Sequence, residues 1–301
     1  MIVKSMLNVQ LMMFLLVTIG YIVRKAGIIG GEGRKNLVDF CLYITLPFNI
    51  VNAFLGTFEW NMLITSGIIL MLSIGYNVIS ILISSFLFKK EEDKKKKTLR
   101  YGTIVSNGSF LGNPVIEGVY GTTGLFYAAL FMLPVRVVVW TVGVSVFLKG
   151  KKENVIKKVL MHPCMVAMYV GAVFMITGIH LPQFLENTIL GISNSNTPLS
   201  MMLVGMMLAE INPKGLINKT MVFYTFIRLI GIPAVIFAIT ALLPIDPMLR
   251  GITVIMAGMP TPITTALLAS KYGGDEKCAT GMIFLSTIAS MVTLPIWCLF
   301  L

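Results

Sequence analysis

The sequence predicts an all-α polytopic membrane protein of ten transmembrane helices, built as two inverted five-helix repeats with broken, crossing fourth and ninth helices. Three observations predict this fold: the composition, the spacing of the apolar blocks, and Gly and Pro positions that recur in the two halves. Of 301 residues, 56% are hydrophobic and only 12% are charged. Soluble domains carry about 25% charged residues, so this composition is that of a membrane protein.

Apolar blocks follow one another along the chain, and most approach or exceed the ~20 residues that cross a ~30 Å hydrocarbon core. They predict spans at residues 7–23, 37–55, 63–88, 99–120, 125–148, 163–181, 198–209, 220–243, 249–269 and 279–301. The seventh span is short. It fits a membrane if residues 183–195 form an interfacial helix before it, followed by a tilted or re-entrant span after Asn196.

The basic residues predict the orientation, because Lys and Arg concentrate in cytoplasmic connections. Most of the 24 Lys and Arg fall in alternate connections, while Lys4 and Arg250 fall in the others. We therefore expect a multi-pass protein of the plasma (cytoplasmic) membrane with both termini extracytoplasmic. Topology and contact with anionic membrane lipid explain the net charge of +11, which gives no case for nucleic acid binding.

Prolines recur at a nearly constant offset in the two halves. Pro47 and Pro198 differ by 151 positions, and Pro114 and Pro260 differ by 146. We interpret residues 1–150 and 151–301 as two five-helix repeats. Because five is odd, the second repeat enters the membrane from the opposite side, an organisation typical of secondary transporters.

The same prolines predict interrupted helices. Pro114 in the fourth span, and Pro260 with Pro262 in the ninth, remove backbone donors and should break or sharply kink their helices. Unpaired backbone at that depth is tolerated only where protein or water covers it, which predicts a polar cavity. Half-helices that cross there would point their N-termini at one place and favour an anion.

Polar side chains surround both predicted breaks: Ser106, Asn107, Ser109, Asn113, Thr261, Thr264 and Thr265. A simpler alternative is a pair of proline kinks without a ligand, in which nearby Ser and Thr bond the freed carbonyls.

Ionisable residues inside apolar spans usually mark a pathway, because they are costly there. Glu117 lies three residues after Pro114, ~5 Å along the helix. It is either a proton-coupling carboxylate or an ionised structural group. Arg136 and Arg228 lie close to the middle of their spans. Three roles fit either arginine: it pairs with Glu117, it binds a substrate carboxylate, or it bonds carbonyls freed at a break.

Two stretches carry a family resemblance. In the fourth span, Asn107, Gly112 and Pro114 form an N-x4-G-x-P pattern. The closing segment reads "GMPTPITTALLASKYGGDEKCATGMIFLSTIASMVTLPIW". With the ten spans and the repeat, the chain resembles the auxin efflux carrier family over essentially its whole length. That family includes the PIN-like plant auxin exporters and bacterial permeases for malate and related organic acids.

The resemblance implies a fold similar to sodium/proton antiporters and bile-acid symporters. Spans 1, 2, 6 and 7 would form a scaffold, through which two copies would form a homodimer, and spans 3–5 and 8–10 a mobile transport domain. Asn107 would contact the substrate, and Asn49 and Asn52 would face it from the scaffold. The candidate substrate-binding residues are Asn107, Asn113, Pro114, Pro260, Thr261, Pro262, Thr264, Thr265, Asn49 and Asn52.

These features predict a secondary transporter that moves a small organic anion, such as malate or an auxin-like acid, by elevator-type alternating access. No cofactor is expected beyond a coupling ion, H⁺ or Na⁺. The chain lacks a P-loop pattern and an H-E-x-x-H pattern, and its 13 acids are too sparse for a metal cluster, so we do not expect an enzyme. The alternative is a membrane-embedded sensor or channel that uses the same cavity.

Overall fold

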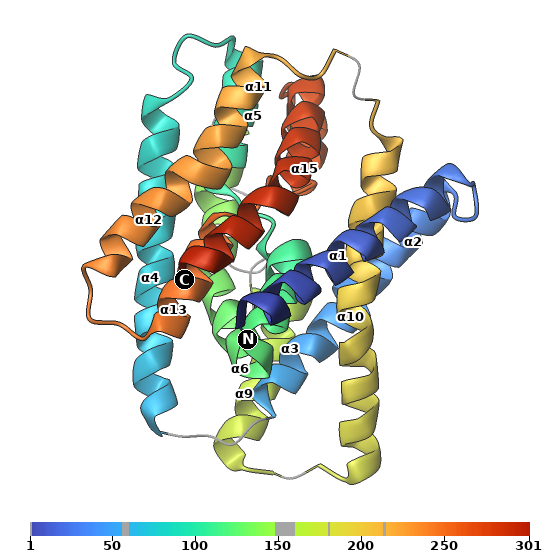
Figure 1. The fold of residues 1–301 in the computed structure, drawn as a ribbon, viewed down its shortest axis with the longest axis vertical. Coiled ribbons are helices and arrows are strands. Elements are labelled where there is room, and N and C mark those ends of the chain that lie inside the picture. The colour runs from blue at the N-terminus through green and yellow to red at the C-terminus, as the bar shows by residue number, and fades with distance from the viewer. Residues whose placement is uncertain (1, 56–59, 148–159, 180, 213–214) are drawn as a thin grey trace. The chain divides into compact units, whose positions relative to one another are not determined.

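The computed structural model describes residues 2–55, 60–147, 160–179, 181–212 and 215–301, and every regular element in these ranges is helical (Figure 1). The chain divides into two compact units. Unit 1 contains Met1–Ile68, Ser109–Leu130 and Ile156–Glu210, and unit 2 contains Ile69–Gly108, Phe131–Val155 and Ile211–Leu301. The predicted boundary between the repeats, at residues 150 and 151, lies outside the described residues.

Unit 1 is built mainly from the helices that begin each predicted repeat. They are α1 (Ile2–Lys25), α2 (Gly31–Phe40), the π-helical η1 (Cys41–Thr45), α3 (Leu46–Phe54), α9 (Pro163–Thr177) and α10 (Gln183–Glu210). Pro47 lies in the first turn of α3, where a missing N–H costs little. The π-helical segment before it takes up the change in hydrogen bonding, so the predicted second span continues as helix.

The expectation for the seventh span was wrong. α10 is one continuous helix of 28 residues, and Pro198 lies inside it. Residues 183–195 therefore do not form a separate interfacial helix, and no re-entrant turn follows Asn196. A proline inside a helix of this kind is accommodated where neighbouring side chains supply hydrogen bonds, and α10 is rich in Ser, Thr and Asn around Pro198.

α1 and α10 pack with their backbones in close contact (Figure 1). A methyl group placed on Gly20 would collide with the backbone of Met202, and one placed on Gly205 would collide with the backbone of Val17. Small residues that let two helices approach this closely are typical of helix pairs in membranes. Arg24 and Arg34 hold the end of α10 through Glu210, at 2.7 and 3.0 Å.

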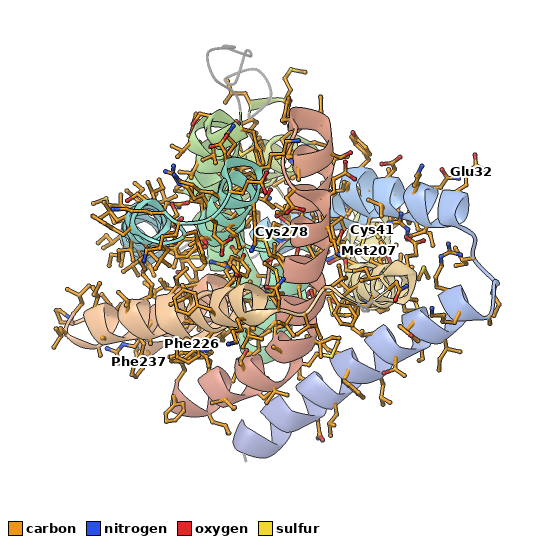
Figure 2. The ribbon with its side chains drawn as sticks, turned by 90° about the horizontal axis from the view of Figure 1, so that it is seen from above. Glu32, Cys41, Met207, Phe226, Phe237 and Cys278 are labelled. Atoms are coloured by element: carbon orange, nitrogen blue, oxygen red, sulfur yellow. The ribbon has the colours of Figure 1, made fainter. Side chains whose placement is uncertain are left out.

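The core of unit 1 is apolar next to this contact. Cys41, a buried free thiol labelled in Figure 2, packs with Leu203 and Met206 of α10. Cys41 lies on the side of η1 that faces α10, and Leu203 and Met206 lie on the side of α10 that faces η1. Burial of these apolar side chains holds η1 against α10.

Unit 2 contains α4 (Trp60–Phe86) from Ile69 onwards and the helices that complete each predicted repeat. They are α5 (Asp93–Ile104), the end of α6 (Asn113–Val138), η3 (Val139–Gly143), α7 (Val144–Phe147), α11 (Lys219–Phe226), η4 (Ile227–Gly231), α12 (Ile232–Ala241), α13 (Pro247–Ala257), α14 (Thr264–Tyr272) and α15 (Glu276–Phe300). A further π-helical segment, η2 (Gly108–Gly112), precedes α6. Inside α6, Gly121 has a φ of 66°, which separates the fourth predicted span from the fifth.

Short polar side chains begin three helices of unit 2. Asn218 accepts a hydrogen bond from the N–H of Met221 at 3.0 Å, and Asp275 accepts one from Cys278 at 2.9 Å. Asp246 does the same for α13. These caps satisfy donors that the first turn of a helix leaves open, and they set where α11, α13 and α15 start.

Large apolar side chains are exposed along many helices, as expected where lipid replaces water. Phe226, labelled in Figure 2, is 54% exposed, and Leu242 is 86% exposed. Within the described residues, five stretches are long and apolar enough to cross a membrane: Gly31–Phe54, Met62–Phe86, Asp93–Phe147, Lys219–Ala241 and Glu276–Phe300. The chain is therefore a helical, multi-pass membrane protein. All ten predicted ranges contain helix, but the number of ten crossings stays a prediction.

Candidate functional site

Two helices of unit 2 are interrupted. α5 ends at Ile104, and Val105 to Asn107 are not helical. α13 ends at Ala257 and α14 begins at Thr264, with a non-helical segment between them that contains Pro260 and Pro262. The ninth span is thus broken where its prolines lie, as predicted.

The fourth span is broken in a different place from the one predicted. The non-helical residues Val105 to Asn107 end seven positions before Pro114. Pro114 instead lies in the first turn of α6, directly after the π-helical η2. The helix has already restarted at Gly108, so the π-helical hydrogen bonding of η2, just before Pro114, accommodates the N–H that this proline lacks.

The two interruptions are bonded to each other. The backbone N–H of Asn107 donates to the carbonyl oxygen of Pro260 at 2.9 Å. Each group would otherwise be an unpaired backbone group in a buried place, at a cost of about 1–3 kcal/mol. We call the residues of these two interruptions, 105–107 and 258–263, the crossover.

Arg228 of η4 stabilises the crossover from the side. Its Nε donates to the carbonyl oxygen of Met259 at 3.0 Å, and its Nη1 donates to that of Thr103 at 3.3 Å. Its Nη2 donates to the hydroxyl of Tyr76 at 3.2 Å. The side chain is fully buried. Of the three roles considered for this arginine, the observed contacts are those of a residue that bonds carbonyls freed at helix breaks.

Two further side chains hold Thr261 within the crossover. The hydroxyls of Tyr224 and Thr261 lie 2.7 Å apart, and the backbone N–H of Thr261 donates to the Oγ of Ser286 at 3.1 Å. Tyr224 is itself buried among apolar residues that include Cys278, labelled in Figure 2. The sequence did not identify Tyr76, Tyr224 or Ser286. Tyr224 lies one turn before Arg228, and that i, i+4 spacing was the available signal.

Other polar groups at the crossover have no protein partner in the described part of the chain. The Oγ of Ser106 and the Oγ1 of Thr265 are buried without a hydrogen bond. The side-chain amide of Asn107, in a residue only 6% exposed, makes none to the described residues either. Because buried polar groups are nearly always paired, these three are suited to bind a ligand. Thr264, another candidate, is exposed, whereas Pro260 and Pro262 are buried.

In unit 1, Glu117 lies in a separate polar cluster. The amide nitrogen of Asn49 is 3.2 and 3.4 Å from its two carboxylate oxygens, and the hydroxyl of Thr197 donates to one of them at 3.1 Å. The same amide nitrogen of Asn49 donates to the Oγ of Ser193 at 3.1 Å. Within the described residues the contacts of Glu117 are with these neutral groups, and it forms no ion pair.

The cluster extends along α10. The hydroxyl of Thr45 donates to the Oδ1 of Asn196 at 3.0 Å, and the Nδ2 of Asn196 lies 3.4 Å from the Oδ1 of Asn49. Thr45 and Asn196 differ by 151 positions, the same offset as Pro47 and Pro198. Two residues at equivalent positions of the predicted repeats therefore contact each other.

The remaining candidates of unit 1 lie apart from these bonds. Asn113 begins α6 and is fully buried, and both polar atoms of its side chain lack a partner among the described residues. Pro114 is buried beside it, and Asn52 is half-buried on α3. Asn113 is thus a second buried amide that remains free for a ligand or a water molecule.

Interrupted helices whose breaks are buried and lined by unpaired polar groups define a class of membrane proteins, the transporters with discontinuous helices. The chain belongs to the family described as membrane transport protein, the auxin efflux carrier family, whose model matches residues 1–158 and 151–298. This confirms the family that the sequence motifs indicated.

Two relatives cover nearly the whole chain. An uncharacterised transporter of Methanocaldococcus jannaschii is 25% identical over 97% of both chains. An uncharacterised transporter of Methanothermobacter thermautotrophicus is 26% identical over 95% of both chains. Membership of this family places the protein in the class of membrane transporters. The similarity to the two relatives covers nearly the whole of each chain.

Proposed function

We propose that the protein is a secondary active transporter of a small organic anion, a carboxylate such as malate or an auxin-like acid. The observation that carries the proposal is a set of buried polar groups at the crossover and next to it: within the described residues, the hydroxyls of Ser106 and Thr265 and the side-chain amide of Asn107 make no hydrogen bond. A transporter needs such groups to replace the hydration of a polar substrate inside the membrane.

Several features favour an anion over a cation or a neutral molecule. The free groups include an amide and two hydroxyls, which can donate to carboxylate oxygens. α14 begins at the crossover, and the N-terminus of a helix attracts negative charge. Two buried arginines, Arg136 and Arg228, belong to the same unit. No acidic residue lies in either interruption.

An elevator-type mechanism with two inverted repeats accompanies this proposal. It is supported by the division of the chain into two compact units and by the contact between Thr45 and Asn196 at the repeat offset. Unit 2, with the crossover, would be the moving part. Glu117, in its cluster in unit 1, is the proposed group for coupling to H⁺ or Na⁺.

The membrane context follows from the distribution of charge. We propose a plasma-membrane protein with ten crossings and both termini outside the cytoplasm, because most Lys and Arg fall in alternate connections. A homodimer formed through unit 1 is part of the proposal, and anionic lipid at the basic connections is its other partner.

Counterflow in proteoliposomes tests the function. Purified protein should exchange labelled malate or indole-3-acetate for the unlabelled acid, with saturation. Asn107→Ala should abolish the exchange and leave the protein folded, because alanine keeps the backbone N–H that bonds Pro260. Asn187→Ala, an exposed position on α10, is the matched control and should exchange normally.

Full exchange by Asn107→Ala would show that this residue does not bind the substrate. A channel or a sensor with the same cavity would give no saturable counterflow, which separates both from a carrier.

A further inference from the structure

The two buried arginines of unit 2 differ in how their charge is used. Every nitrogen of the Arg228 guanidinium donates a hydrogen bond, to Met259, Thr103 and Tyr76. Arg136 is only 5% exposed, yet its Nη1 and Nη2 make no hydrogen bond within the described residues. A buried charge without a partner is costly, and it persists in membrane proteins mainly where a pathway or a ligand uses it.

The neighbours of Arg136 on its helix show which way it faces. Met132 precedes it by four residues and Val139 follows it by three, so the three side chains share one face of the helix. The sulfur of Met132 lies against the backbone of Gly108, the residue that directly follows the first interruption. Val139 packs on the cluster that contains Ile104 and Val105. The helix that carries Arg136 therefore packs, through residues on either side of it, on the segment that contains the interruption at residues 105–107.

That interruption also holds free polar groups. In the part of the chain that the structure describes, neither the hydroxyl of Ser106 nor the side-chain amide of Asn107 makes a hydrogen bond. A planar guanidinium with two free nitrogens can bind both oxygens of one carboxylate, a geometry that an ammonium or a hydroxyl alone does not provide. The hydroxyl of Ser106 and the side-chain amide of Asn107 would form hydrogen bonds with the other polar atoms of the ligand, as donors or as acceptors.

We propose that Arg136 pairs with the carboxylate of the transported anion and supplies the positive charge of the substrate site. The inference rests on the proposed transport function and deepens it, because it makes a carboxylate, and not merely a polar molecule, the required part of the substrate. Arg228 holds the crossover in shape, and Arg136 recognises the charge. Among the described residues, Nη1 and Nη2 of Arg136 have no acceptor, and under the proposal the bound anion neutralises the guanidinium charge.

Binding measurements test this pairing directly. Thermal unfolding of the purified protein is followed with succinate, malate and indole-3-acetate, and with their neutral amides succinamide, malamide and indole-3-acetamide. At least one acid should raise the unfolding temperature of the wild type, and its amide should not. Arg136→Gln should weaken that acid's binding by about 30-fold or more, because it removes one partner of a buried charge pair.

Matched variants complete this experiment. Arg136→Lys keeps the charge but loses the planar fork, so it should bind more weakly than the wild type and more tightly than Arg136→Gln. Lys90→Gln removes an exposed charge of the same unit and should bind like the wild type. Equal binding by wild type and Arg136→Gln, or no stabilisation of the wild type by any of the acids, overturns the proposal.

A purely structural role for Arg136 predicts a different result without ligand. Under the proposal, Arg136→Met removes an unpaired buried charge, so the unfolding temperature of the empty protein should stay equal or rise. If Arg136→Met or Arg136→Gln lowers that temperature or prevents folding, the arginine is structural and the proposal fails. Transport itself is tested separately, by counterflow with the wild-type protein. The Arg136 proposal can therefore fail while the proposed transport function is confirmed.

Discussion

The Nε of Arg228 donates a hydrogen bond to the carbonyl oxygen of Met259 at 3.0 Å, in the interruption between α13 and α14. The same guanidinium reaches the carbonyl of Thr103 on α5 and the hydroxyl of Tyr76 on α4. One side chain therefore ties both interrupted helices to a third helix. The bonds satisfy backbone groups that proline and the broken helices leave open.

Replacing this arginine should destabilise the protein severely. Arg228→Met leaves the carbonyls of Met259 and Thr103 buried without a donor, and we expect a loss of at least about 3 kcal/mol. Arg228→Lys should recover only part of it, because an ammonium cannot span the same three acceptors. Thermal unfolding in detergent measures both variants, and an unfolding temperature of Arg228→Met equal to that of the wild type would contradict this role.

Two variants of Glu117 separate the effect of its negative charge from the effect of its hydrogen bonds. Glu117→Gln keeps an oxygen for Asn49 and Thr197 and should fold normally, but transport should no longer depend on a proton or sodium gradient. Glu117→Leu removes the acceptor of the Thr197 hydroxyl and of one N–H of Asn49, whose amide nitrogen keeps its bond to Ser193, and should cost about 2 kcal/mol. Uptake by proteoliposomes with and without an imposed gradient measures the coupling, and unchanged gradient dependence in Glu117→Gln would assign the carboxylate a structural role.

The contact between α1 and α10 predicts opposite effects for two glycines of the same helix. Gly205→Ala should destabilise by about 2 kcal/mol, because the new methyl group meets the backbone of Val17. Gly191→Ala has no atom within 4 Å of the added carbon and should stabilise by about 0.5 kcal/mol. Thermal unfolding of the pair measures this difference. Similar unfolding temperatures for the two variants would mean that the helices separate easily at this contact.

Glu91, in the connection between α4 and α5, predicts a pH effect. A hydrogen bond from Lys95, at 2.8 Å, lowers the pKa of the Glu91 carboxyl; burial opposes this shift, and a bond from Thr220 adds to it. A lowered folded-state pKa gives stability that is present above the unfolded-state value and is lost as the pH falls through the folded-state pKa.

The unfolding temperature of Glu91→Gln should therefore lie below that of the wild type at neutral pH and approach it as the pH falls below about 4. Glu92→Gln, a neighbouring exposed position, makes the same charge change and should follow the wild type. A difference between Glu91→Gln and the wild type that stays constant with pH would exclude this linkage.

The sequence predicted the elements that depend on local chemistry. The prolines at 260 and 262 indicated the second interruption correctly, because two prolines so close together remove two backbone donors within one turn. Pro114 and Pro198 were misleading for a related reason. Whether a proline breaks a helix depends on its place in the helix and on nearby hydrogen bonds, and a sequence pattern does not show either.

The residues that bond the crossover could not be predicted from the sequence, because segments far apart in the chain bring them together. Tyr76, Tyr224 and Ser286 looked like ordinary polar residues of apolar helices, and only the fold brings them to Arg228 and Thr261. Arg136 and Arg228 were indistinguishable by position along their spans. The structure separates them by their hydrogen bonds: all three nitrogens of the Arg228 guanidinium donate, whereas Nη1 and Nη2 of Arg136 have no acceptor among the described residues.

The bond from Asn107 to Pro260 has a consequence for the exchange of backbone hydrogens with solvent. A break in a helix is ordinarily where deuterium enters first, because its amides lack partners and open readily. The backbone N–H of Asn107 is instead bonded, in a residue that is only 6% exposed, and the buried Arg228 bonds both Thr103, just before this interruption, and Met259 in the other one. Deuterium should reach it as slowly as it reaches the helices on either side, so the crossover behaves as a rigid joint.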